Sequence, residues 1–225
     1  MRRGDPLEPL GLSLASGATE IHIVRHADAV PDDGVASAAY QDYDLHALSE
    51  RGRAQAEATA ERFAALGVAA VYASPIRRAL ETGLAIAVRT GIAEVAKEHD
   101  LREVEIGDVQ AGDLTMRERL EMLAVIAIRD GSWNAIPGTE PSAGVRARVT
   151  ATLDRIAARH PGSRVVAVSH AGAINAFLGA VAGTPHDFVF PLANAAISVV
   201  RINGARRLLM SANETAHLRV EARMR

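Results

Sequence analysis

The chain has 225 residues, of which 48% are hydrophobic and 23% charged, as is usual for a globular protein with a well-filled core. Its net charge of -2 argues against the broad basic surface of nucleic-acid-binding proteins, so any anion must be bound by a few local charges. There is no cysteine, which excludes disulfide bonds, thiolate metal sites and a thiol nucleophile.

Residues 1–19 contain two arginines directly after Met1 but no apolar stretch long enough for a signal peptide. We expect this part to be a flexible leader and 20–225 to form one domain. Nowhere does the sequence contain a run of about 18 uninterrupted apolar residues, so no membrane span is expected. The predicted location is therefore the cytoplasm.

Apolar runs and helical periodicity alternate after the leader. Ser49 and Ser74 are the expected N-caps of two helices, which are expected to end at Gly67 and Gly91. Pro75 is suited to the first turn of the second helix. The elements predicted up to residue 112 are, in chain order, a strand at 21–24, a loop at 31–43, a helix at 49–67, a strand at 68–73, a helix at 74–91, a strand at 92–96 and a loop at 97–112.

The second half of the chain continues this alternation. The elements predicted here are a helix at 115–129, a loop at 131–142, a helix from 145 that is closed by 160–162, a strand at 164–168, a helix at 171–182 and strands at 196–201 and 208–211. Strands that alternate with helices favour a mostly parallel sheet with helices on both faces. The expected fold class is α/β, a three-layer α/β/α sandwich around a mostly parallel central sheet.

Two of the predicted strands lead directly to a histidine beside small residues. Arg25 and His26 follow the run 21–24, and His170 follows the run 164–168 after one serine. The carboxyl ends of strands are where an open α/β sheet presents side chains to a ligand. We predict that these two strands are neighbours and that His26 and His170 face a common anion.

Further residues are suited to phosphoryl transfer by histidine. Such a site needs a neutral imidazole as nucleophile, cations around the phosphoryl oxygens and an acid for the leaving oxygen. Arg77 and Arg78 lie in the first turn of a predicted helix, and Glu103 lies in a polar loop. The helix that begins at Ala171 would add backbone N–H groups and the positive end of its dipole.

Six motifs, in this order, resemble the histidine phosphatase superfamily, in particular its phosphoglycerate mutase-like branch. The motifs are Arg25-His26-Ala27, Leu48-Ser49-Glu50-Arg51-Gly52, Ser74-Pro75-Ile76-Arg77-Arg78-Ala79, Leu101-Arg102-Glu103 with Gly107-Asp108, Ser169-His170-Ala171-Gly172 and Asn213-Glu214-Thr215-Ala216-His217-Leu218. The resemblance extends over about 20–218. It implies a phosphoglycerate mutase-like fold and a phosphatase that needs no metal or other cofactor.

The resemblance also implies a role for each matching residue. His26 would be the nucleophile that becomes phosphohistidine, and Glu103 would protonate the leaving group and then activate water. The phosphoryl oxygens would be bound by Arg25, Arg78, His170 and Ala171. Arg78 is preferred over Arg77 because alanine follows it in the motif, and Arg77 is expected to be a solvated surface charge.

The chain departs from the family pattern at several positions. Ala27 replaces the usual glycine, Val104 stands where glycolytic mutases have a substrate-binding arginine, and 28–40 lacks the tryptophan-asparagine pair of those mutases. These departures favour a phosphatase over a phosphoglycerate mutase-type phosphotransferase, which is the alternative enzyme. A non-catalytic phosphate-binding relative is a third hypothesis, and Ala27 is the feature that favours it.

The segments 31–43 and 109–141 match the family least and are expected to contact the substrate. Trp133 is expected either to line this pocket or to pack a lid, and for Asn194 a turn role and a pocket role are equally open. The remaining histidines are expected to be structural or surface residues: His22, His46, His99, His160, His186 and His217. The expected partner is a small phosphorylated substrate or inorganic phosphate, without nucleic acid or membrane, and a homodimer is an open alternative.

Overall fold

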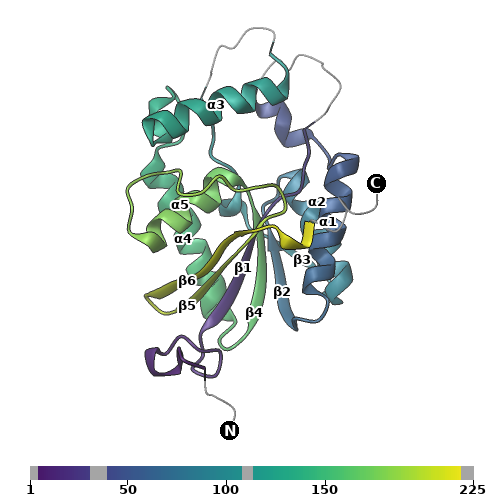
Figure 1. Ribbon diagram of the computed structural model, residues 1–225, viewed down its shortest axis with the longest axis vertical. Coiled ribbons are helices and arrows are strands. Elements are labelled where there is room, and N and C mark those ends of the chain that lie inside the picture. The colour runs from purple at the N-terminus through teal and green to yellow at the C-terminus, as the bar shows by residue number, and fades with distance from the viewer. Residues whose placement is uncertain (1–4, 31–39, 108–113, 219–225) are drawn as a thin grey trace.

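The computed structural model describes residues 5–30, 40–107 and 114–218. In these ranges the chain forms a six-stranded sheet with helices on both faces (Figure 1). The strand order is β3-β2-β4-β1-β5-β6. The first four strands are parallel to one another, β5 pairs antiparallel with β1, and β6 pairs antiparallel with β5. The predicted α/β fold with a mostly parallel central sheet is thereby confirmed.

All of the predicted strands and helices are present. The strands are β1 (Thr19–Arg25), β2 (Val68–Ala73), β3 (Val95–Lys97), β4 (Arg164–Ser169), β5 (Ile197–Asn203) and β6 (Arg206–Glu214). The α-helices are α1 (Glu50–Phe63), α2 (Arg77–Thr90), α3 (Met116–Asp130), α4 (Ser142–Arg159) and α5 (Ala171–Ala182). None of the helices in the described ranges is long and apolar enough to cross a membrane.

Several predicted boundaries differ from the structure, and three of them illustrate local causes. α1 ends at Phe63, which is fully buried, and Gly67 with its positive φ of 64° belongs to the turn that precedes β2. Ser74 does not cap α2, because its hydroxyl lies 2.8 Å from the Nε2 atom of His170. β3 begins only at Val95, the first residue that pairs with β2.

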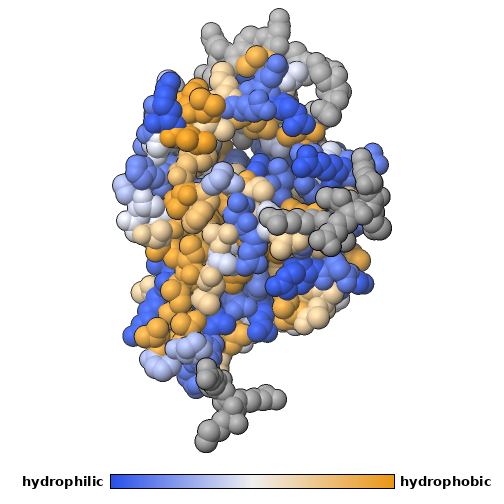
Figure 2. All heavy atoms as spheres, in the orientation of Figure 1, coloured by the Kyte–Doolittle hydropathy of each residue, from blue (hydrophilic) through white to orange (hydrophobic). Residues whose placement is uncertain are grey.

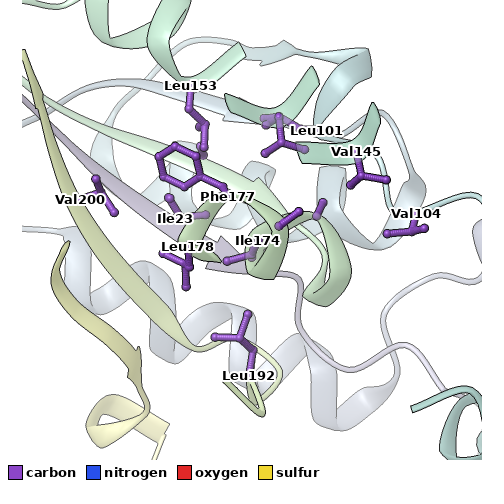
Figure 3. Close-up of a cluster of buried hydrophobic side chains, with 14 of the residues drawn as sticks. Ile23, Leu101, Val104, Val145, Leu153, Ile174, Phe177, Leu178, Leu192 and Val200 are labelled. Carbon is purple, nitrogen blue, oxygen red and sulfur yellow. The ribbon is translucent and has the colours of Figure 1, made fainter. Parts of the chain in front are cut away.

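The two faces of the sheet bury separate apolar clusters, because successive side chains of a strand point to opposite faces. Ile23 of β1 packs under α4 and α5, in the cluster that contains Phe177 (Figure 3). On the other face, Val24 packs with Phe63 of α1 and Ile86 of α2. Both faces of β1 are therefore buried, which gives its carboxyl end a rigid base.

α3 lies apart from the two helical layers. Figure 1 shows it above the carboxyl ends of the central strands. Thr115 and Glu118 form a capping box at its first turn, and the helix ends at Gly131 in the left-handed conformation. Leu123 and Ala127 join the core, so α3 is anchored by one face while spanning the ends of the strands.

Residues 5–18, which were expected to belong to the leader, lie against the end of the sheet where β5 turns into β6. Arg201 of β5 donates to a carboxylate oxygen of Asp5 at 2.8 Å. Asn203 donates to the carbonyl oxygen of Gly11 at the same distance. These bonds hold the described part of the segment in place, and a separate leader up to residue 19 stays a prediction.

Candidate active site

The two strand-end histidines come together as predicted. β1 and β4 are adjacent and parallel, with Val24 paired to Val168. Just beyond this pair, the backbone N–H of His26 donates to the carbonyl oxygen of Ser169 at 2.9 Å. The ring centroids of His26 and His170 are 5.0 Å apart. The register of the sheet therefore places both imidazoles at one point.

Hydrogen bonds orient the imidazole of His26, which is only 2% exposed. Its Nδ1 atom lies 2.8 Å from the carbonyl oxygen of Ala27, and Arg78 Nε donates to its Nε2 atom at 3.2 Å. A carbonyl oxygen can only accept and a guanidinium can only donate, so Nδ1 carries the proton and Nε2 keeps its lone pair. The nucleophilic form of the ring is thus held in place.

Burial and positive charge also keep both imidazoles neutral. Burial, together with the guanidinium groups of Arg78 and Arg25, lowers the pKa of His26 well below its usual value of 6.5. The pKa of His170 is lowered in the same way, first by burial and then by Arg78. A neutral imidazole is the state that nucleophilic attack requires.

Arg78 and Arg77 are adjacent but lie in different environments. Arg78 is fully buried, donates to the carbonyl oxygen of Tyr43 at 2.7 Å, and lies with its guanidinium carbon 3.9 Å from the Tyr43 ring centroid. Asp44, 3.2 Å away, is its carboxylate partner. Arg77 is exposed and pairs with Glu81, as expected for a solvated charge.

His170 has one ring nitrogen available for a ligand. Its Nε2 atom lies 2.8 Å from the hydroxyl of Ser74, and that hydroxyl accepts the backbone N–H of Ile76 at 3.3 Å. This arrangement suits a serine that donates to Nε2 and leaves the proton on Nδ1. Among the described residues the buried Nδ1 atom has no hydrogen-bond partner.

Backbone N–H groups hold the carboxyl group of Glu103. Its Oε1 accepts from Val104 and Ala173 at 3.0 Å, and its Oε2 accepts from Gly172 at 3.2 Å. A Cβ atom on Gly172 would lie 2.7 Å from Oε1, so the close approach requires glycine. The first turn of α5 was expected to face the anion, but here two of its N–H groups bind Glu103 instead. The role of Ala171 in anion binding stays a prediction.

Arg148 of α4 fixes the loop that carries Glu103. It donates to the carbonyl oxygens of Asp100 at 2.7 Å, Arg102 at 2.9 Å and Glu103 at 3.0 Å. Glu140 accepts from two of its nitrogens at 2.7 and 2.8 Å. The side chain therefore connects three loop carbonyls to one carboxylate. The sequence analysis did not identify this residue.

The start of α1 supports the chain just beyond His26. Ser49 caps the helix by accepting the N–H of Gly52, and its hydroxyl donates to Asp28 at 2.6 Å. Gln55 accepts the backbone N–H of Asp28 at 2.9 Å. A Cβ atom on Gly52 would lie 1.8 Å from the carbonyl oxygen of Asp28, so no side chain fits there. This motif at the start of α1 thus positions the segment that follows His26.

Ala27 fits its position without strain. Its φ is not positive, unlike that of Ala195, and its methyl group is fully buried in a small cluster with Tyr43 and Leu48. Its backbone N–H donates to Thr82 at 3.1 Å. The backbone here does not need glycine.

A cavity of about 270 Å³ adjoins these groups, lined among others by Arg25, His26, Glu103 and Ala171. Trp133 also lines the cavity, and the centroid of its ring lies 4.6 Å from the ring centroid of Phe188. The site residues predicted from the sequence therefore meet at one end of the sheet, with Arg78 and His170 buried beside His26. The segments 31–39 and 108–113, also expected to contact substrate, lie outside the described residues.

Asn194 and several of the other histidines make structural hydrogen bonds. Asn194 donates to the carbonyl oxygen of His26 at 3.2 Å, which favours the turn role that was considered for it. His22 pairs with Glu20 at 3.2 Å, and His99 is exposed. Structural bonds are also made by His160 with Tyr72 and by His217 with Thr59.

Comparison with known proteins identifies the family to which the chain is similar. The family model described as "Histidine phosphatase superfamily (branch 1)" matches residues 21–215. A "Metal-independent phosphoserine phosphatase" of Arabidopsis thaliana is 31% identical over 213 residues, 92% of this chain and 86% of that protein. "Phosphoglycerate mutase-like protein 4" of the same plant is 29% identical over 203 residues, 88% and 86% of the two chains. A solved mycobacterial glucosyl-3-phosphoglycerate phosphatase has a TM-score of 0.71 at 26% identity, covering 88% of this chain and 100% of that one.

Proposed function

The chain belongs to branch 1 of the histidine phosphatase superfamily, and we propose that it is a metal-independent phosphomonoesterase that acts on a small phosphorylated molecule through a phosphohistidine on His26. The observation that carries this proposal is the state of His26. The ring is buried and neutral, its Nε2 lone pair faces Arg78, and Glu103 lines the same cavity. These are a nucleophile, a cation for the phosphoryl oxygens and an acid, in one place.

In the first step, the Nε2 lone pair of His26 attacks phosphorus. The phosphorus–oxygen bond to the alcohol breaks, its electron pair stays on the alcohol oxygen, and protonated Glu103 gives that oxygen its proton. Arg25, Arg78 and the Nδ1–H of His170 bind the phosphoryl oxygens, whose charge they stabilise through the transition state. Phosphohistidine and the free alcohol result.

In the second step, water attacks the phosphorus of phosphohistidine. The Glu103 carboxylate takes a proton from the water, and the phosphorus–nitrogen bond breaks with its electron pair returning to Nε2 of His26. Inorganic phosphate leaves, and both residues regain their starting protonation states. One carboxyl group therefore serves as acid in the first step and as base in the second.

A phosphoglycerate mutase is the second candidate, which the similarity to "Phosphoglycerate mutase-like protein 4" favours. Val104 argues against it, because this residue is 1% exposed and packs in the core where the mutases have an arginine. The two activities differ in their products. A phosphatase releases inorganic phosphate from 3-phosphoglycerate or another ester, whereas a mutase converts 3-phosphoglycerate to its isomer without net release.

The covalent intermediate is the direct test of the proposal. p-Nitrophenol is a good leaving group that needs little protonation, so Glu103→Gln slows the second step more than the first with p-nitrophenyl phosphate. Rapid quench of Glu103→Gln with ³²P-labelled p-nitrophenyl phosphate is expected to trap an acid-labile, base-stable phosphoprotein. Glu103→Gln combined with His26→Ala is the control and is expected to trap no label. Turnover by the wild type without any label on His26 in the trap would contradict the proposal.

A further inference from the structure

The cavity beside His26 has two chemically different ends. The polar end holds Arg25, His26 and Glu103, to which the proposed function assigns the phosphoryl group and the leaving oxygen. The other end is where the rest of the substrate must lie. It is formed by α3, by the turn at Trp133 and by the segment that follows α5.

Hydrophobic side chains make up this second end. α3 contributes residues spaced three or four positions apart, so they share one face of the helix. The large apolar side chains that line this end include Leu120, Leu123, Ile128, Trp133, Phe188 and Phe190. Figure 2 shows hydrophobic residues gathered on α3 and on the segment below it. Ile128 is 61% exposed, so an apolar surface stands open beside the catalytic groups.

The polar side chains of the lining offer no charge for a second anionic group. Among the described residues that line the cavity, the ionisable ones are Arg25, His26, Tyr43 and Glu103, all at the catalytic end. Arg25 donates to the carbonyl oxygen of Leu192 at 2.5 Å. In the sequence, 31–39 and 108–113 contain no lysine, arginine or histidine. A carboxylate on the substrate would therefore meet no additional cation among the described residues that line the cavity.

Among the described residues of the lining, Asn175 is the one side-chain amide, and all of its hydrogen-bonding groups are already used by the protein. Its NH₂ group donates to the carbonyl oxygens of Ala171 and Phe190, both at 3.0 Å. Its oxygen accepts the backbone N–H groups of Val189 and Phe190, both at 2.9 Å. The amide therefore braces the segment that carries Phe188 and Phe190, and it is not available to a substrate.

We propose that the substrate of this site is the phosphate monoester of an apolar alcohol or phenol, whose hydrocarbon part lies on the apolar face of α3. This inference rests on the proposed function. Burial of hydrocarbon against such a surface is favourable, whereas burial of a carboxylate or ammonium group without a partner is costly. A volume near 270 Å³ lies just below the roughly 300–1,000 Å³ of most small-molecule pockets, so the hydrocarbon part is small.

A series of alkyl phosphates tests this directly. Ethyl, butyl and hexyl phosphate have leaving groups of similar basicity, so their demand for the Glu103 proton is the same. We expect kcat/KM to rise about fourfold for each added methylene until the cavity is filled. Phosphoserine and 3-phosphoglycerate are expected to be hydrolysed at least about 100-fold less efficiently than hexyl phosphate, because their charged groups lose water without gaining a partner.

Two substitutions on α3 form a matched pair. Ile128→Gln changes a residue that lines the cavity, and Val125→Gln changes one that is 64% exposed and does not line it. Ile128→Gln is expected to lower kcat/KM for hexyl phosphate about tenfold and to leave ethyl phosphate unchanged. Val125→Gln is expected to change neither. Because both side chains are largely exposed, both variants should fold as the wild type does.

The outcomes separate the two proposals. Hydrolysis of p-nitrophenyl phosphate through His26 with no dependence on alkyl chain length, or with phosphoserine as the better substrate, would overturn the apolar-substrate inference and leave the phosphatase proposal standing. Equal losses in Ile128→Gln and Val125→Gln would also overturn the inference. A folded protein that releases no phosphate from any of these esters would overturn the phosphatase proposal, and this inference with it.

Discussion

Two buried histidines, one in the middle of β1 and one directly after its last residue, show how the surroundings determine the chemistry of an imidazole. His22, 7% exposed, lies with Nε2 3.2 Å from a carboxylate oxygen of Glu20 and with its ring edge-on to Phe63. His26, 2% exposed, lies with Nε2 3.2 Å from the guanidinium of Arg78. The two rings are buried to a similar extent, but the group next to Nε2 is a carboxylate for His22 and a guanidinium for His26. One ring is hydrogen-bonded to a carboxylate, and the other is kept neutral with its lone pair in place.

Near the amino end of β1, both carboxylate oxygens of Glu20 have hydrogen-bond partners within the protein. Glu20 accepts from Arg164 at 3.0 Å and from Arg201 at 2.9 Å, in addition to His22. The bond from His22 contributes most to lowering the pKa of Glu20 to about 2. At the carboxyl end, the cations face a histidine instead of a buried carboxylate. Positive charge gathered around a neutral imidazole is therefore what distinguishes the candidate active site from a structural ion pair.

Removal of each histidine should have opposite consequences, and this is the largest effect that we predict. His26→Ala should lower kcat/KM for p-nitrophenyl phosphate by a factor on the order of 10⁴, because no other group can form the phosphoenzyme. His22→Ala should change it less than threefold, yet lower the free energy of unfolding by about 1–2 kcal/mol through the lost contacts with Glu20 and Phe63. Steady-state kinetics and urea unfolding of both variants measure this. High activity in His26→Ala would show that His26 is not the nucleophile and that the two histidines do not differ in this role.

The sequence predicts the strand-end residues well because they are local. His26 follows β1 and His170 follows β4 directly, so knowing that the strands are adjacent is enough to place both rings together. Arg148 could not be placed in this way. It acts on loop carbonyls 45 to 48 positions away, and along α4 it appears only as one more basic residue beside an apolar stripe. The prediction that Ser74 caps α2 was wrong for a similar reason. A serine before proline usually caps a helix, but here the hydroxyl of Ser74 lies beside the distant His170.

Glu103→Gln should have the next largest effect, and its size should depend on the leaving group. The amide can keep part of the position that the carboxyl group has on the N–H groups of Gly172 and Ala173, but it cannot give a proton. We expect kcat/KM for ethyl phosphate to fall about 100- to 1,000-fold, and that for p-nitrophenyl phosphate less than tenfold. An equal loss with both esters would show that Glu103 positions the site without transferring the proton. The affinity for inorganic phosphate, measured by calorimetry, should stay within about threefold of the wild type.

The hydrogen-bonded network around Glu20, near the amino end of β1, should make the stability of the protein depend on pH. The carboxyl of Glu20 has a pKa of about 2 in the folded protein and 4.5 as its ordinary value, so its contribution is present above pH 4.5 and is lost as the pH falls toward 2. Glu20→Gln should lower the free energy of unfolding at pH 7 by about 2 kcal/mol and remove this part of the acid slope. Urea unfolding between pH 2 and 7 measures both. The exposed Glu57→Gln on α1 is the control and should leave the curve unchanged.

The smallest predicted effect concerns the neighbour of the buried arginine. Arg77 and Arg78 carry the same charge in the first turn of α2, but only Arg78 contacts His26. The ion pair of Arg77 with Glu81 is largely exposed, and Glu81 still accepts the backbone N–H of Leu48 without it. We therefore expect Arg77→Ala to change the free energy of unfolding by less than about 0.5 kcal/mol and kcat/KM by less than twofold. A tenfold loss of kcat/KM in Arg77→Ala would mean that the summed charge at this end of the sheet, and not direct contact with the imidazole, controls His26. Long-range electrostatics would then explain why His26 differs from His22. The size of that effect would be measured by the dependence of kcat/KM on salt concentration in the wild type and in Arg77→Ala.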